Sequence, residues 1–517
     1  MFRKVLVANR GEIALRVMRA CREMSISTVA VFSIADRKSL HRAYADEAFE
    51  IGGEDPSESY LNADRLLRVA KRSGAEAVHP GYGFLAENSE FVKRCEEEGL
   101  VFIGPDSRAM ALAGDKLQSK RVLEDAGIEV SPGSNRAVKD ADDAIGVAEK
   151  VGYPIILKIS GGGGGIGMEI VEGPEQMEGA LTRARSLALS AFGVSDVFLE
   201  KYHRGARHIE FQILSDGNRT IHLGERECSI QRRYQKLVEE APSPAVTEEV
   251  REEMGRLSIK AAEALGYVNA GTIEYVYSGE RFYFNEVNAR LQVEHPVTEM
   301  VTGLDIVREQ IAIAAEEGLS LDQEDLDIRG WALECRINAE DPFRGFLPSP
   351  GRVTDMSLPG GPGVRVDTAL REGQLISAAY DPLVAKVITH GGDRTQATHR
   401  MRRALDEIMI KGIRVNVPLH QAIIRNQAFL RGDLSTSFLS DMKIDEALAT
   451  MREKGEERQR ELVVALAAAV AVSEGALPWR TETFVTQRRM PGAWSLAGRE
   501  ALQRLRLTYG HEVRRIA

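Results

Sequence analysis

Hydrophobic residues recur in the first part of the chain both as short runs and with a helical period, which predicts alternating strands and helices. The runs KVLVA and STVAVFS are typical of buried strands, and RGEIALRVMRACREM between them has the spacing of an amphipathic helix. The alternation continues through EAVHPGYGF and GLVFIGP. We therefore expect a parallel α/β domain over residues 1–114, with Gly11 and the loop Gly81–Gly83 placed after strands, where open α/β sheets bind ligands.

The pattern changes in the middle of the chain. Helical segments DKLQSKRVLEDAG and DDAIGVAEKVG precede a strand, YPIILKIS, which enters the run GGGGGIG and is followed by a second strand, MEIV. From about residue 205 the strands are separated by short turns: HIEFQIL turns at SDGN into RTIHLGE, and GTIEYVYS turns near SGE into RFYFNEVN. This spacing predicts antiparallel pairing.

Period-two alternation is most informative in FNEVNARLQVEHPVTE, residues 284–299. Glu286, Asn288, Arg290, Gln292 and Glu294 occupy every second position, which predicts that they share one face of a single strand. A solvated outer face is one interpretation. The presence of Asn, Gln and Arg between the carboxylates favours a second interpretation, in which these side chains converge on a metal or an anion.

The preceding strand offers a further carboxylate, Glu274. An odd number of residues in the turn would put Glu274 and Glu286 on one face, whereas a two-residue turn would separate them. Two carboxylates with Asn288 would suit magnesium bound to the phosphates of a nucleotide. Two ordinary surface acids are the alternative.

The glycine run has to be distinguished from the common nucleotide motifs. Gly162, Gly164 and Gly167 satisfy GxGxxG, but a strand rather than a helix follows, and the sequence contains no GxxxxGK[ST]. Glycines between two strands can fold over a polyphosphate and offer unobstructed backbone N–H groups. Lys158, at the end of the entering strand, favours such a phosphate lid over a flexible linker.

Composition restricts the function classes. The 517 residues are 43% hydrophobic and 28% charged with a net charge of −10, which is typical of a globular protein and disfavours general nucleic-acid binding. The four cysteines form no CxxC pair, which favours a reducing compartment. The N-terminus lacks a signal-peptide pattern, and the longest apolar run, 462–472, is too short to span a bilayer. We expect a cytoplasmic protein without a membrane partner.

Together, YPIILKISGGGGGIGM and FNEVNARLQVEHPVTEM resemble the two signature motifs of biotin carboxylase, an ATP-grasp enzyme. The resemblance covers about residues 1–442 and includes HPGYGFLAEN, GERECSIQRRYQKLVEEAPS and ECRINAEDP. It implies an α/β protein with an N-terminal pre-ATP-grasp domain, an ATP-grasp domain at 115–330 with its lid at about 131–203, and a C-terminal mixed α+β domain at 331–442. Residues 443–517 are expected to form a helical tail.

The resemblance also implies a role for each matching position. ATP would contact Lys116, Lys158, Gly161, Gly162, Gly163, Gly164 and Gly165, with Glu200 and Lys201 at the adenine and His208 and Gln231 near the ribose and phosphates. Mg²⁺, or alternatively Mn²⁺, would be held by Glu274, Glu286 and Asn288. Bicarbonate would bind Lys236, Arg290, Gln292 and Val293 beside Glu294, and biotin would meet Arg336 and Tyr82.

The implied reaction is ATP-dependent carboxylation of biotin through carboxyphosphate. Glu294 would remove the bicarbonate proton as general base, and Arg336 would stabilise the negative ureido oxygen of biotin. Two departures concern the lid, because the family usually has a cation at the position of Ile166 and commonly Arg at that of Glu169. They keep open a nucleotide-binding assembly or regulatory subunit of weak activity, and another ATP-grasp ligase is a further alternative.

The expected partners follow from the same resemblance. Biotin carrier domains carry Met-Lys-Met, and the chain offers only Met442-Lys443, so we expect a separate biotin carboxyl carrier protein and a carboxyltransferase subunit. Related subunits often have Phe at the dimer contact where this chain has Pro362, but Arg19, Glu23 and Arg365 remain, which favours a homodimer. The arginine-rich segment from residue 475 is expected either to cover the protein's own surface or to dock partner subunits. Acyl-CoA and pyruvate are both compatible final acceptors.

Overall fold

The computed structural model describes residues 1–159, 167–192, 196–279 and 281–473. Residues 1–451 form one unit and residues 452–517 a second. The glycines of the expected lid, with Ile166, and the arginine-rich end lie outside the described residues. Among the described helices, none has an apolar stretch long enough to cross a membrane.

The N-terminal part is a parallel sheet covered by helices, as the alternating pattern predicted. Its strands are β1 (Lys4–Val7), β2 (Ser27–Ser33), β3 (Glu47–Gly52), β4 (Ala77–His79) and β5 (Val101–Phe102), in the order β3-β2-β1-β4-β5. Its helices are α1 (Gly11–Glu23), α2 (Leu40–Tyr44), α3 (Ala63–Ser73), α4 (Ser89–Glu97) and α5 (Ser107–Gly114). The buried strands carry the continuous apolar runs typical of a sheet covered on both faces.

The chain winds outward from β1 to β3 and then crosses to β4, so β1 and β4 flank the point where the strand order reverses. Asn9, after β1, donates to the carbonyl oxygens of Pro80 and Tyr82 at 2.6 and 2.7 Å. Gly81 between them has φ +63°, and a Cβ there would approach Asn9 and Ile13 to 3.0 Å. The loop after β4 is therefore fixed against the start of α1.

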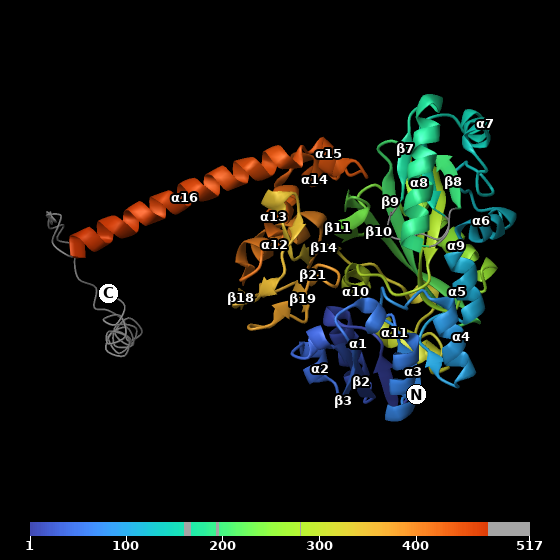
Figure 1. The fold of residues 1–517 in the computed structure, drawn as a ribbon, viewed down its shortest axis with the longest axis horizontal. Coiled ribbons are helices and arrows are strands. Elements are labelled where there is room, and N and C mark those ends of the chain that lie inside the picture. The colour runs from blue at the N-terminus through green and yellow to red at the C-terminus, as the bar shows by residue number, and fades with distance from the viewer. Residues whose placement is uncertain (160–166, 193–195, 280, 474–517) are drawn as a thin grey trace. The chain divides into compact units, whose positions relative to one another are not determined.

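A small antiparallel sheet, β7-β6-β8, follows in the middle of the chain. Its elements are α6 (Lys116–Asp125), α7 (Ala141–Val151), β6 (Ile155–Ile159), β7 (Glu169–Val171), α8 (Met177–Phe192) and β8 (Val197–Lys201). Figure 1 shows α8 lying along this sheet, where Leu181 and Ala184 pack with Ile155 and Leu199. The two strands predicted on either side of the glycine run are both present.

An eight-stranded antiparallel sheet, β13-β12-β9-β10-β11-β14-β21-β19, joins the middle and the C-terminal parts. The strands are β9 (Arg207–Ser215), β10 (Thr220–Arg232), β11 (Gln235–Ala241), β12 (Asn269–Ser278), β13 (Arg281–Asn288), β14 (Trp331–Asn338), β19 (Val364–Thr368) and β21 (Leu383–Gly391). Because β11 pairs with β14, hydrogen bonding is continuous across the expected domain boundary at residue 330.

The remaining described elements are helices, of which α9, α10 and α12 pack on the sheet, and pairs of short strands. The helices are α9 (Glu248–Ala264), α10 (His295–Thr302), α11 (Ile306–Ala314), α12 (Arg394–Glu407), α13 (Val417–Arg425), α14 (Gln427–Arg431), α15 (Phe438–Asp441) and α16 (Ile444–Ser473). The paired short strands are β15 (Glu340–Asp341) with β16 (Leu347–Pro348), β17 (Gly351–Arg352) with β20 (Leu375–Ile376), and β18 (Asp355–Ser357) with β22 (Met409–Lys411). Met401 and Leu405 of α12 pack on Leu333 and Val387 of the sheet.

A β-bulge sets the register between β12 and β13. Ser278 pairs with Arg281, so only two residues form the turn, which by parity alone would place Glu274 and Glu286 on opposite faces. The register shifts between Glu274 and Tyr275, leaving Asn285 as the extra residue of β13. Beyond the bulge Glu274 lies directly opposite Glu286, so the two carboxylates share a face.

The prediction of one strand over residues 284–294 is wrong. β13 ends at Asn288, residues 289–294 form a connecting loop, and Glu294 immediately precedes α10. The polar side chains of this segment therefore do not form a single strand face. Glu286 and Asn288 belong to the sheet, whereas Arg290, Gln292 and Glu294 approach from the loop.

A charged row crosses the sheet and depends on one buried cation, Arg226. Glu286, Glu274, Glu210 and Arg226 lie directly opposite one another on β13, β12, β9 and β10. The Arg226 side chain is fully buried and donates to Glu210 at 2.6 Å. It also donates to Gln212 and Thr272, and to Thr298 of α10, at 2.8–3.1 Å, so it ties the helix to the sheet.

We predict that Arg226→Met lowers the free energy of unfolding by about 3–5 kcal/mol, because it removes a cation paired with the buried Glu210 and leaves Gln212, Thr272 and Thr298 without their donor. The urea midpoint of unfolding, followed by circular dichroism, measures this change. Arg403→Met is the control, since Arg403 pairs with Glu407 on the surface of α12 and such pairs contribute about 1 kcal/mol or less. Equal midpoints for the two variants would contradict the prediction.

Candidate functional site

A cavity of about 1080 Å³ lies between the carboxyl ends of β1 and β4 and one face of the eight-stranded sheet. Most of the site residues expected from the sequence line it. They are Tyr82, Lys116, Lys158, Glu200, Lys201, His208, Gln231, Lys236, Glu274, Glu286, Asn288, Arg290, Gln292, Val293 and Arg336. Glu294 is fully buried directly behind this lining.

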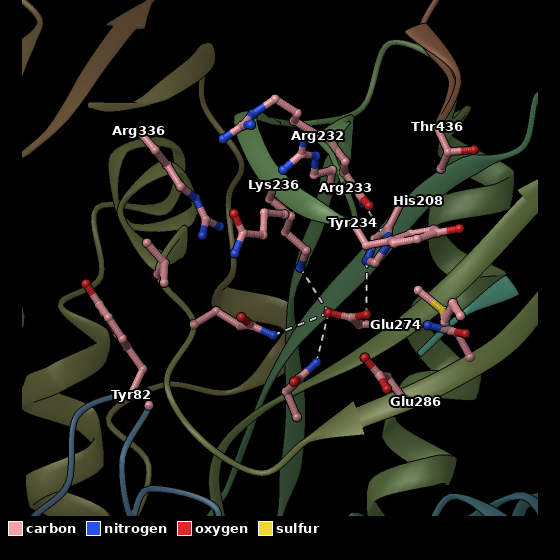
Figure 2. A pocket seen from close by; sticks show the side chains of 18 of the residues that line it. Tyr82, His208, Arg232, Arg233, Tyr234, Lys236, Glu274, Glu286, Arg336 and Thr436 are labelled. Carbon is pink, nitrogen blue, oxygen red and sulfur yellow. Dashed lines mark hydrogen bonds and ion pairs between the residues drawn. The ribbon is translucent and has the colours of Figure 1, made fainter. Parts of the chain in front are cut away.

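Glu274 is the centre of the polar contacts (Figure 2). One carboxylate oxygen accepts from Lys236 at 2.9 Å, Asn288 at 2.8 Å and Gln292 at 3.4 Å. The other lies 3.1 Å from Nε2 of His208. Burial alone would lower the pKa of His208, but the Glu274 carboxylate raises it to about 9, so the imidazole is cationic at neutral pH.

Lys236, on β11, lies among three carboxylates. Its ammonium group contacts Glu210, Glu274 at 2.9 Å and Glu294 at 2.6 Å. Burial alone would lower the pKa of Lys236, but these three charges hold it well above the usual range. The lysine therefore remains charged and keeps three buried acidic groups together.

Two further lysines lie near the Glu286 end of the cavity. Lys116 Nζ is 2.8 Å from Glu286, and although burial opposes it, this charge lowers the pKa of Glu286 to about 2. Lys158 Nζ lies 2.6 Å from Glu200 and 3.0 Å from Asn285. A phosphate chain would thus meet two ammonium groups at this end of the cavity.

Glu200 and Lys201, which were expected at the adenine, have different kinds of partner. The buried carboxylate of Glu200 pairs with both Lys158 and Lys120. The ammonium group of Lys201 donates to the carbonyl oxygens of Gly152 and Tyr153, each at 2.9 Å. The Lys201 side chain thus fixes the loop that enters β6.

Arg290 and Arg336 each pair with carboxylates at the cavity. Arg290 donates to Glu87 at 2.8 Å, to Gln292 at 3.0 Å and to Asn288 at 3.1 Å. Arg290 therefore links the loop after β4, where Glu87 lies, to the loop after β13.

Arg336 donates to Glu239 at 2.6 Å and to Glu294 at 2.8 Å. Burial alone would raise the pKa of Glu294, but Lys236, with Arg336 in addition, lowers it. Glu294 is therefore ionised at neutral pH and can accept a proton. Figure 2 shows Tyr82 and Arg336 on the same side of the pocket, with Glu286 on the other.

The residues present fit a divalent cation such as magnesium. Glu274 and Glu286 are paired across β12 and β13, and Asn288 follows on the same face, so all three offer oxygen ligands. Lys236 and Lys116 already contact these two carboxylates, which shows that their potential attracts cations. Glu210, also near His208 and Glu274, is occupied by Arg226 and Lys236.

Sequence reasoning missed several residues of the site. They are Glu12, Glu87, Glu210, Glu239 and Lys386. An acidic residue inside an otherwise apolar strand, as in HIEFQIL, is the signal that could have identified Glu210. The others act through partners that are distant in the sequence.

Three family descriptions match the chain in succession. Residues 1–110 match the biotin carboxylase N-terminal domain, residues 115–322 the ATP-binding domain of the carbamoyl-phosphate synthase L chain, and residues 334–441 the biotin carboxylase C-terminal domain. The chain is 53% identical over 445 residues to a pyruvate carboxylase subunit of Methanothermobacter thermautotrophicus, covering 86% of this chain and 90% of the relative. It is 49% identical over 443 residues to biotin carboxylase 1 of Bacillus subtilis, covering 85% and 98%.

Solved structures show the same similarity. The biotin carboxylase domain dimer of Hydrogenobacter thermophilus 2-oxoglutarate carboxylase, in complex with MgADP, ADP and bicarbonate, is 48% identical with a TM-score of 0.85. The match covers 87% of this chain and 99% of that one. The Campylobacter jejuni biotin carboxylase in a β,γ-ATP complex is 42% identical with a TM-score of 0.83, covering 85% and 99%.

We predict that Lys236→Met destabilises the protein most at alkaline pH. Burial raises the pKa of Glu210 and Glu294, and the charge of Lys236 now lowers both. Without that charge each pKa is higher than in the parent, so the loss of stability becomes smaller as falling pH protonates the carboxylates.

Melting temperatures of parent and variant between about pH 5 and 8, without nucleotide or divalent cations, measure this effect. The difference should be largest at the upper end of the range. Lys71→Met removes an exposed lysine paired with Glu98 and serves as control. A difference for Lys236→Met that does not vary with pH would contradict the prediction.

Proposed function

The chain belongs to the biotin carboxylase family, and on that premise we propose that it carboxylates biotin held on a separate carrier protein, using ATP and bicarbonate. One observation carries the proposal: the ionised carboxylate of Glu294 lies between Lys236 and Arg336, beside the paired carboxylates of β12 and β13. A proton acceptor thus lies beside two cationic side chains that could hold an anion, and beside the two carboxylates that would hold the magnesium ion of a nucleotide.

The ATP end of the cavity provides charge neutralisation. Lys116 and Lys158 would contact the phosphates, with Gly161–Gly165 covering them. Glu274, Glu286 and Asn288 would hold Mg²⁺, which when bound neutralises phosphate charge. Lys116, which contacts Glu286, would then be free to approach the phosphates. Glu200 and Lys201 would border the adenine, and His208 and Gln231, 3.1 Å apart, would lie near the ribose and phosphates.

The bicarbonate end provides position and a base. Lys236, Arg290, Gln292 and Val293 would hold the anion in line with the γ-phosphate, so that an oxygen of bicarbonate attacks phosphorus while ADP leaves. Glu294 accepts the bicarbonate proton. The carboxyphosphate formed in this way divides into CO₂ and phosphate, and the phosphate takes the N–H proton of biotin. The biotin nitrogen then attacks CO₂.

Biotin would lie at the end of the cavity marked by Arg336 and Tyr82. Arg336 is fixed by Glu239 and Glu294, so its guanidinium is already oriented for the ureido oxygen that becomes negative. The hydroxyl of Tyr82 donates to Glu12, which fixes the ring at the cavity wall. A lid that excludes water would protect carboxyphosphate from hydrolysis.

The charge of Glu169 is compensated within the chain, which weakens the alternative of a regulatory subunit with weak activity. Arg183 of α8 donates to its carboxylate at 3.0 Å. The anion gained relative to the family is therefore held by a neighbouring cation.

For partners we propose a biotin carboxyl carrier protein and a carboxyltransferase. A homodimer is supported by the dimeric structure of the related Hydrogenobacter domain.

Release of ADP with bicarbonate, in the presence and absence of free biotin, tests the proposed function. Biotin-stimulated release is expected. Release stimulated by an amine instead of biotin would indicate another ligase, and nucleotide binding without turnover would indicate an assembly subunit.

We predict that Arg336→Ala and Glu286→Gln fail at different steps. Arg336→Ala should retain part of the bicarbonate-dependent ATP hydrolysis but lose about 100–1000-fold in carboxybiotin formation, because a donor to the ureido oxygen is removed. Glu286→Gln should suppress ATP cleavage with or without biotin, because a magnesium ligand is weakened.

Labelled bicarbonate incorporation into biotin and ADP release, measured on folded variants, separate the two effects. Arg352→Ala, which removes an exposed arginine bonded to the carbonyl of Gly373, is the control. Parental carboxybiotin formation by Arg336→Ala would show that the biotin site lies elsewhere.

A further inference from the structure

The loop at residues 289–294, between β13 and α10, has two consecutive carbonyl groups held by buried side chains. The carbonyl oxygen of Gln292 lies 2.8 Å from Nδ1 of His295. The next carbonyl, that of Val293, accepts from Nζ of Lys386 on β21 at 2.7 Å. Neither His295 nor Lys386 belongs to the site residues identified from the sequence, and both are completely buried.

The protonation of the two side chains follows from these contacts. Burial, with the charges of Lys386, Arg16 and Arg365 in addition, lowers the pKa of His295 well below its usual range, so the ring is neutral. A neutral ring nitrogen 2.8 Å from a carbonyl oxygen must carry the proton, so Nδ1 is the donor. Nε2 has no hydrogen-bond partner within the described part of the chain.

Lys386 remains charged because carboxylates surround it. Its ammonium lies 3.3 Å from Glu12, and Arg336 and Asp367 flank it on the neighbouring strands of the sheet. Burial alone would lower the pKa of Lys386, but the negative charges of Glu12, Glu334 and Asp367 raise it. The Val293 carbonyl is therefore held by a full positive charge.

Because peptide groups are planar, these two contacts also fix the directions of the next backbone N–H groups in the loop. In a trans peptide the C=O and the next N–H point in opposite directions. Holding the Gln292 carbonyl toward His295 turns the Val293 N–H away from the interior, and holding the Val293 carbonyl does the same for the Glu294 N–H. Val293 lines the cavity, and its N–H has no acceptor among the described residues.

We propose that His295 and Lys386 are positioning residues that aim the backbone N–H groups of the loop at the substrate anion. The inference rests on the proposed function, in which that anion is bicarbonate. Side chains such as Arg290 and Gln292 can rotate, whereas an N–H fixed through its own peptide plane needs no rearrangement when the anion binds. Neither His295 nor Lys386 is among the described residues that line the cavity.

Two nearly isosteric substitutions separate positioning from simple packing. The amide nitrogen of His295→Asn can occupy the place of Nδ1, whereas that of His295→Gln reaches the place of Nε2 and leaves the Gln292 carbonyl without a donor. We expect His295→Gln to raise the KM for bicarbonate roughly three- to tenfold, the usual effect of one lost hydrogen bond, with the KM for ATP unchanged. His295→Asn should restore the parental KM for bicarbonate.

Lys386→Met removes the donor to the Val293 carbonyl and should also raise the KM for bicarbonate. This variant provides the test if His295→Gln does not fold. His41→Gln is the matched control, because His41 is equally buried and contacts the carbonyl of Val31 at 3.2 Å in the N-terminal sheet. It should leave the KM for bicarbonate unchanged.

Equal values for His295→Gln and His295→Asn, an unchanged KM in Lys386→Met, or a raised KM in the His41 control would each overturn the inference. A parental protein without bicarbonate-dependent ADP release would instead refute the proposed function itself.

Discussion

The ammonium group of Lys236, surrounded by Glu210, Glu274 and Glu294, is the interaction on which the rest of the site depends. The three carboxylates belong to β9, β12 and the residue before α10, and burying them together without a cation would be strongly unfavourable. Lys236 also joins the two halves of the proposed chemistry, since Glu274 belongs to the nucleotide end and Glu294 to the bicarbonate end. Arg226 is a second cationic partner of Glu210, and Lys116 neutralises Glu286, the remaining carboxylate of the row.

The sequence predicted much of the fold because its patterns are local. The buried strands of the N-terminal sheet, the two strands flanking the glycine run and the antiparallel hairpins all follow from hydrophobic periodicity. The same rule failed beyond Asn288, where polar residues continue at every second position although the backbone has left the sheet. The number of residues in the turn before β13 was also insufficient to predict which face Glu286 occupies, because the bulge at Asn285 shifts the register by one residue. A bulge depends on pairing with another strand, which periodicity does not record.

The site was predicted where the family motifs are contiguous and missed where it depends on tertiary pairing. Lys386 lies in an ordinary apolar strand and gains its importance only from Glu12 of α1 and the Val293 carbonyl. Glu239 matters because β11 pairs with β14, which brings it to Arg336. No spacing within the sequence specifies these contacts.

The residues around Glu274 and Glu294 are proposed to activate bicarbonate by phosphoryl transfer. Transfer of oxygen from bicarbonate to phosphate tests it most directly. With ¹⁸O-labelled bicarbonate, ATP and biotin, attack of bicarbonate on the γ-phosphate predicts that the inorganic phosphate released carries one ¹⁸O atom, detected by mass spectrometry before the label exchanges with water. Inorganic phosphate that gains oxygen from water alone, while ADP is released, would contradict the account.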